Sequence, residues 1–102
     1  MNNNKIRKGP VLRPRFLANC EFNSGVYGQP FYITGYAKNI VAYERKLKKY
    51  LLNYYGKGEG QYNQADGSYE YMDGEVSVTV TGIEELHDPE RMFRLCQIGG
   101  WI

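Results

Sequence analysis

The chain has 102 residues, of which 42% are hydrophobic and 24% are charged, which is ordinary for a globular domain and excludes disorder of the whole chain. Two cysteines without CxxC spacing and one histidine exclude a zinc site of sulfur and imidazole ligands. The sequence contains no run of about 18 apolar residues, which is the length that a membrane-spanning helix needs. The net charge of +2 divides unevenly: residues 1–57 hold eleven Lys and Arg against two acids, and residues 58–102 hold two against nine. A basic and an acidic face follow if the halves stay apart in the fold, whereas interleaved packing would mix the charges.

Residues 1–10 are polar and basic, with three consecutive asparagines and a Gly-Pro pair, and we expect them to form a flexible arm. They lack the apolar core of a secretory signal, so we expect a cytoplasmic protein. Residues 11–102 are expected to form a single α+β domain. Alternation from Phe16 to Phe22 predicts a strand with one buried face, a turn follows at 23–25, and the aromatic and β-branched run at 31–36 predicts a second strand.

The clearest helix runs between Asn39, a suitable N-cap, and Gly56, a suitable C′ residue. At 100° per residue it has an apolar arc and, opposite, a basic stripe. Glu44 and Lys48 have the i, i+4 spacing of an ion pair. The arc consists of Ile40, Tyr43, Leu47, Tyr50, Leu51 and Tyr54, and the stripe consists of Arg45, Lys46 and Lys49.

Three short strands with Asp-Gly pairs between them predict a β-meander, because type I′ hairpin turns favour Asp-Gly. Their expected bounds are Gln61–Ala65, Ser68–Met72 and Glu75–Thr81, with Val76, Val78 and Val80 facing the core. The segment 89–98 fits either a short helix begun by Asp88-Pro89 or a further strand. Trp101 and Ile102 are expected to dock on the domain.

The resulting fold is α+β, in the order ββ-α-βββ. A single antiparallel sheet of about five strands packs against one long amphipathic helix, with a short C-terminal helix or extra strand.

Catalytic arrangements are weak in this sequence. Cys20 with His87 is the one Cys/His pairing that uses the lone histidine at a distance in the sequence. No glycine-rich elbow or helix start beside Cys20 marks an activated thiol, and a buried apolar role fits it better. Glu84 and Glu85 are adjacent and point apart in a strand. The glycine-rich run 56–60 follows a helix and lacks P-loop spacing, so a plain loop is favoured over a phosphate cradle. We therefore expect no enzyme activity, no metal and no cofactor.

Basic and aromatic residues are the more informative group. Cations on an arm and a helix stripe can follow phosphates, and exposed tyrosines can stack on bases or serve a protein interface. The candidate nucleic-acid-binding residues are Arg7, Lys8, Arg13, Arg15, Arg45, Lys46 and Lys49, and the candidate exposed tyrosines are Tyr62, Tyr69 and Tyr71.

The leading hypothesis is a small non-catalytic binding protein whose basic N-terminal half engages a polyanion, either nucleic acid or nucleoprotein. The alternative is a protein-binding inhibitor or adaptor of the kind that phages and mobile elements encode. It would bind a host or bacterial protein through the tyrosine-bearing sheet or the acidic surface. A homodimer is compatible with both hypotheses, and convergence of the basic residues on one surface would favour the first.

Overall fold

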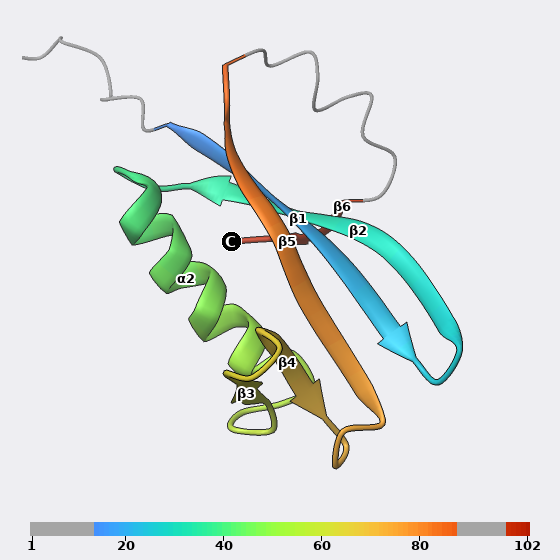
Figure 1. Cartoon of the computed structure of the whole chain (residues 1–102). Helices are drawn as coiled ribbons and strands as arrows, with labels where there is room; N and C mark the ends of the chain where they lie inside the picture. The colour runs from blue at the N-terminus through green and yellow to red at the C-terminus, as the bar shows by residue number, and fades with distance from the viewer. Residues whose placement is uncertain (1–13, 88–97) are drawn as a thin grey trace, which may run out of the picture.

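A computed structural model describes residues 14–87 and 98–102 (Figure 1). These residues form one six-stranded sheet, ordered β3-β4-β5-β1-β2-β6, and helix α2 (Ile40–Leu52) covers one of its faces. The strands are β1 (Arg15–Ser24), β2 (Tyr27–Tyr36), β3 (Gln61–Asn63), β4 (Ser68–Tyr71), β5 (Val76–Leu86) and β6 (Ile98–Trp101).

The predicted α+β class, with one sheet against one helix, agrees with this arrangement. The predicted strand number and the purely antiparallel pairing are wrong, because β6 adds a sixth strand that pairs in parallel with β2. Of the segment 89–98, whose sequence fits either a helix or a strand, Ile98 begins β6 and the rest lies outside the described residues. The candidate arm at residues 1–10 also lies outside them.

The β1–β2 hairpin turns over only two residues, since Ser24 pairs with Tyr27. Gly25 occupies the first central position with φ +62°, which is the glycine position of a type II′ turn. β2 therefore starts earlier than predicted and includes Pro30. A proline, which has no N–H group, is tolerated there because β6 pairs with β2 only from Tyr32 to Thr34.

β5 continues past the predicted end at Thr81 through a bulge. Cys20 of β1 pairs with Val80 and Asn19 pairs with Gly82, so Thr81 is the extra residue. Its hydroxyl donates to the Asn19 carbonyl at 3.1 Å. The extra residue shifts the alternation by one position, so Ile83, at an odd position, faces the helix as the even-numbered Val76, Val78 and Val80 do.

Helix α2 begins as predicted, because the Asn39 side chain accepts a hydrogen bond of 2.9 Å from the Ala42 N–H group. It ends at Leu52, earlier than predicted, where Asn53 forms the C-cap. The Asn53 amide donates to the Lys49 carbonyl and its oxygen accepts from the Gly58 N–H group. The side chain of Asn53 therefore turns the chain away from the helix axis before Gly56.

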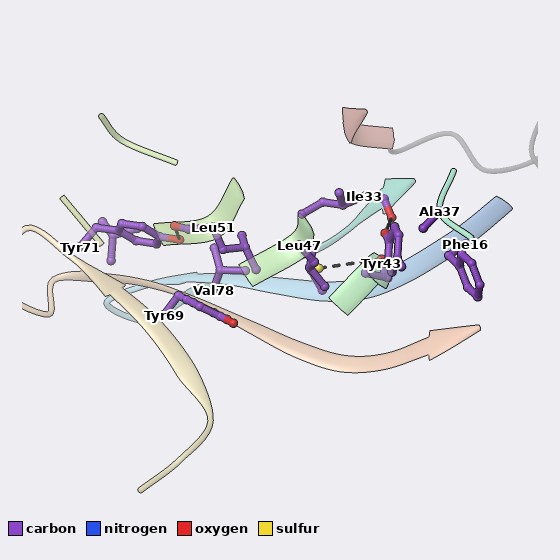
Figure 2. Close-up of a cluster of buried hydrophobic side chains, with 12 residues drawn as sticks. Phe16, Ile33, Ala37, Tyr43, Leu47, Leu51, Tyr69, Tyr71 and Val78 are labelled. Carbon is purple, nitrogen blue, oxygen red and sulfur yellow. Dashed lines mark hydrogen bonds between the residues drawn. The ribbon is translucent and has the colours of Figure 1, made fainter. Parts of the chain in front are cut away.

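The core lies between α2 and the sheet (Figure 2). On the helix, burial is complete along the single i, i+4, i+8 line of Tyr43, Leu47 and Leu51, whereas Ile40 is 44% exposed. Tyr50 and Tyr54 are partly buried against the same core, so of the predicted apolar arc only Ile40 lies largely in solvent. The sheet contributes buried side chains from β1, β2, β4 and β5, among them Phe16, Ala18, Cys20, Ile33, Tyr69, Tyr71, Val76 and Val78.

The two meander turns are longer than predicted. Asn63 pairs with Ser68, and Tyr71 pairs with Val76, so each loop has four residues and not two. Side-chain oxygens of Asn63 and Asp66 accept backbone N–H groups within the first loop, which stabilises a wider turn. The glycines nevertheless take positive φ angles, +73° at Gly67 and +89° at Gly74.

Candidate nucleic-acid interface

The outer face of α2 is basic. Arg45 and Lys49 project opposite the buried line of the helix, Lys46 and Lys48 flank them, and all four are exposed. None forms an ion pair with a carboxylate among residues 14–87 and 98–102. The predicted pair between Glu44 and Lys48 is not formed, because the Lys48 ammonium lies 5.4 Å from the centroid of the Tyr62 ring. These cations are therefore available to an anionic ligand.

Acidic residues lie on the opposite face of the sheet. Glu21 alternates with Cys20 and Phe22, which face the helix, and Glu70 alternates in the same way with Tyr69 and Tyr71. Glu84 also faces away from the helix, where it accepts a hydrogen bond from Asn19 at 3.3 Å. Glu21, Glu70 and Glu84 thus lie on the sheet face away from the basic helix layer. Arg15 lies on that face as well, because it alternates with the buried Phe16, and Glu44 lies exposed on the helix, so the charges separate only in part.

Arg15 and Lys46 meet at Tyr36, the last residue of β2. The Lys46 ammonium donates to the Tyr36 carbonyl at 2.8 Å, and the Arg15 guanidinium donates to the Tyr36 hydroxyl. The guanidinium carbon lies 4.2 Å from the centroid of the Tyr36 ring and 5.3 Å from that of Trp101. We call Arg15, Tyr36, Lys46 and Trp101 the basic–aromatic corner; it joins the helix layer to the end of the sheet.

Four predicted binding residues are thus described, and two of them converge. Arg15 and Lys46 belong to the basic–aromatic corner, while Arg45 and Lys49 extend the same charge along α2. The remaining candidates, Arg7, Lys8 and Arg13, lie outside the described residues.

The predicted patch of exposed tyrosines on the meander is wrong. Tyr69 is 8% exposed and Tyr71 is 1% exposed, and of the three candidates Tyr62 alone, at 42%, is open to solvent. The cause is strand register: β4 pairs with β5 so that Tyr69 lies beside Val78 and Tyr71 beside Val76, which places both rings under the helix (Figure 2).

Sequence reasoning missed Tyr36 and Trp101. Tyr36 is 49% exposed, and Trp101 is 62% exposed although docking was expected for it. Only Ile102 docks, with its N–H group donating to the Thr34 carbonyl at 2.9 Å and its side chain against the core. The one available signal was that Trp101 is the only tryptophan of the chain.

Cys20 and His87 are not brought together. Cys20 is in the core at 3% exposure, and burial raises the pKa of its thiol to about 12, which disfavours the reactive thiolate. The His87 side chain is 80% exposed beside Glu85 at the end of β5. This pair therefore has neither the geometry nor the ionisation of a catalytic dyad.

The glycine-rich run after α2 uses its own N–H groups internally. Gly58 donates to the Asn53 side chain, Glu59 to the Gly56 carbonyl and Gly60 to the Leu52 carbonyl. A phosphate cradle needs several N–H groups aimed at the ligand, so the plain loop predicted for this run is confirmed. Among the described residues, no group of His, Cys, Asp and Glu could hold a metal ion.

A shallow cleft of about 290 Å³ lies between α2 and the meander, with Lys48 and Glu44 on one side and Tyr62 and Tyr69 on the other. The two tyrosine rings pack across the β3–β4 pair with centroids 4.9 Å apart. The cleft is open to solvent and has both Lys48 and Glu44 on its helix side, so it is a continuation of the helix surface and not an enclosed ligand cavity.

Comparison of the chain with models of protein families, with curated proteins and with solved structures found no match. Within residues 14–87 and 98–102 no helix is long and apolar enough to cross a membrane. The function is therefore proposed from the geometry of the basic helix face and the basic–aromatic corner.

Proposed function

We propose that this chain is a non-catalytic nucleic-acid-binding protein. The observation that carries the proposal is the meeting of Arg15 and Lys46 at Tyr36, because it makes the cations of α2 continuous with those at the end of the sheet. An isolated basic helix stripe is common on protein surfaces, whereas a stripe that continues into exposed aromatic rings is typical of nucleic-acid interfaces.

The cations are suited to phosphate groups. The Lys46 ammonium gives one hydrogen bond to the Tyr36 carbonyl, and its other N–H groups are free to contact a phosphate oxygen. Arg45 and Lys49 lie at the centre of the outer helix face, so the sugar–phosphate backbone of a nucleic acid that lies along the helix would contact both. Binding through such contacts releases counterions, and the affinity therefore falls steeply with salt.

The acidic sheet face limits where the ligand can lie. Glu21 and Glu70 project from the face opposite α2, where they would repel phosphate groups. Arg15 lies on the same face, but at the opposite end of the ladder, where it pairs with Tyr36. We therefore expect the ligand to run along the helix layer and around the end of β2 to Arg15, and to avoid the part of the sheet face that carries Glu21 and Glu70.

The test is a titration of labelled single-stranded and duplex oligonucleotides at several salt concentrations. Replacing Arg45, Lys46 and Lys49 together with Gln should flatten the slope of log K against log salt by about 2 to 3 units, since each lost contact contributes about 0.9 for duplex DNA and about 0.7 for single strands. Removal of residues 1–10 should flatten it further, because the candidate cations Arg7 and Lys8 are lost.

A matched control replaces the exposed acids Glu21 and Glu75 with Gln. It changes charge outside the helix face and the basic–aromatic corner and should leave the salt slope unchanged. Absence of binding at low salt, or equal slopes for the helix variant and the wild type, would refute the proposal. A protein partner bound through Tyr62 and the acidic face would then become the leading alternative.

A further inference from the structure

We propose that Trp101 and Tyr36 form a stacking site for unpaired nucleobases, so that the ligand is single-stranded nucleic acid. This inference rests on the proposed function and names its substrate class. It comes from the aromatic half of the basic–aromatic corner, which phosphate contacts alone do not explain.

The two rings are presented side by side with a cation between them. Trp101 pairs with Thr34 in the β2–β6 ladder, and Tyr36 lies two residues further along β2, so alternation puts both side chains on the sheet face away from α2. The Arg15 guanidinium lies over both rings, 4.2 Å from the centroid of Tyr36 and 5.3 Å from that of Trp101. A planar base can add to such an array by stacking on a ring or on the guanidinium plane.

Trp101 is held on a rigid element. The following residue, Ile102, donates its N–H group to the Thr34 carbonyl at 2.9 Å and packs its side chain against the core. The preceding residue, Gly100, lies so close to Tyr50 that a Cβ atom would be 2.6 Å from the tyrosine oxygen. Because β6 is fixed on both sides of Trp101, little conformational entropy is lost when a base stacks on the indole.

Unpaired bases fit this site better than a duplex does. In a duplex each base is already paired and stacked on its neighbours, so its flat faces are not accessible to a side chain. In a single strand the base and its phosphate are both accessible, so a base can stack on the rings beside Arg15 while a neighbouring phosphate reaches Lys46, which lies at the Tyr36 carbonyl on the helix side. Protein interfaces are enriched in aromatic residues and Arg but depleted in Lys, so the presence of Lys46 at Tyr36 favours a nucleic acid.

The experiment uses the fluorescence of Trp101, which is the only tryptophan in the chain and therefore reports on this site alone. The full chain is titrated with three probes of equal length: oligothymidylate, a DNA duplex, and an abasic oligonucleotide that keeps the phosphates but lacks bases. Oligothymidylate should quench the emission and bind about tenfold or more tightly than the abasic strand, which follows from the measured effect of stacking on one base. The abasic strand should bind without quenching.

Two variants distinguish the loss of the stacking site from a loss of folding. Trp101→Ala should weaken binding of oligothymidylate about fivefold or more and leave the affinity for the abasic strand unchanged. The control is Tyr27→Ala, which removes a 55% exposed tyrosine at the other end of β2 and should change neither affinity. Thermal melting checks that both variants fold. The quenching measurement uses the wild-type protein and therefore tests the stacking site even if a variant fails to fold.

The possible failures are distinguishable. Equal affinities for oligothymidylate and the abasic strand, with no change in emission, would overturn the stacking site and leave the proposed function intact. Tighter binding of the duplex than of the single strand would also overturn it. Absence of binding to all three probes would refute the proposed function itself.

Discussion

The hydroxyl group of Tyr71 in β4 donates a hydrogen bond of 2.6 Å to the carbonyl oxygen of Leu51, in the last turn of α2. A second bond runs in the opposite direction, from the hydroxyl of Tyr43 on the helix to the Ile33 carbonyl of β2, also at 2.6 Å. Both tyrosines are almost completely buried. The helix is thus attached to the sheet near its two ends by polar contacts within an otherwise apolar layer.

We predict that Tyr71→Phe lowers the free energy of unfolding by about 1 kcal/mol, because a buried hydrogen bond is lost while the ring remains. The matched control is Tyr62→Phe, which alters an exposed tyrosine of the same meander and should have almost no effect. Urea denaturation of the three proteins measures the difference. Equal stabilities of Tyr71→Phe and the wild type would mean that the Leu51 contact contributes nothing.

We predict a loss of stability at alkaline pH. Burial raises the pKa of Cys20 from 9.0 to about 12 and raises the pKa of Tyr43 and Tyr71 above the ordinary 10.0. The unfolded state therefore loses these protons first, so the stabilising contribution is complete below about pH 9 and declines as the pH rises further, by up to about 1.4 kcal/mol per pH unit for each group.

Two variants divide this decline into its parts. Cys20→Val should remove the part that begins between about pH 9 and pH 10, and Tyr43→Phe should reduce the slope above about pH 10. Urea denaturation in a series of alkaline buffers gives both slopes. A stability that is constant up to about pH 11 in the wild type would contradict the burial of these groups.

We predict that Gly67→Val and Gly74→Val each lower stability by about 1 to 2 kcal/mol. Both glycines have positive φ angles, +73° and +89°, at which a β-branched residue is strained. The same substitution at Gly82, whose φ is not positive and whose nearest neighbour to an added Cβ is 3.9 Å away, is the control. Thermal melts that show no difference between the turn variants and Gly82→Val would contradict the turn geometry.

Features set by neighbouring residues could be predicted from the sequence. The Asn39 cap depends on the helix residues directly after it, and the inward direction of Val76 and Val78 follows from alternation within one strand. Positive φ at Gly67 and Gly74 follows in the same way from the turn position of glycine.

Features that depend on pairing between distant segments could not be predicted from the sequence. Alternation places Tyr69 and Tyr71 on one side of their strand, but which side faces the helix depends on the register with β5. The basic–aromatic corner requires the parallel pairing of Trp101 with Thr34 and the approach of Lys46 to Tyr36. Neither contact has a local signal in the sequence, so Tyr36 and Trp101 were missed.

The position of β1 between β2 and β5 has a consequence for how the chain folds as it is made. The β1–β2 hairpin closes over two residues and can form early, but its other edge pairs with β5, and residues 25–75 lie between β1 and β5. Until β5 has left the ribosome, β1 exposes a full row of unpaired N–H and C=O groups along the edge that β5 later covers. Two nascent hairpins can pair along this edge, so the yield of folded protein should fall with synthesis rate and concentration more steeply than its final stability implies.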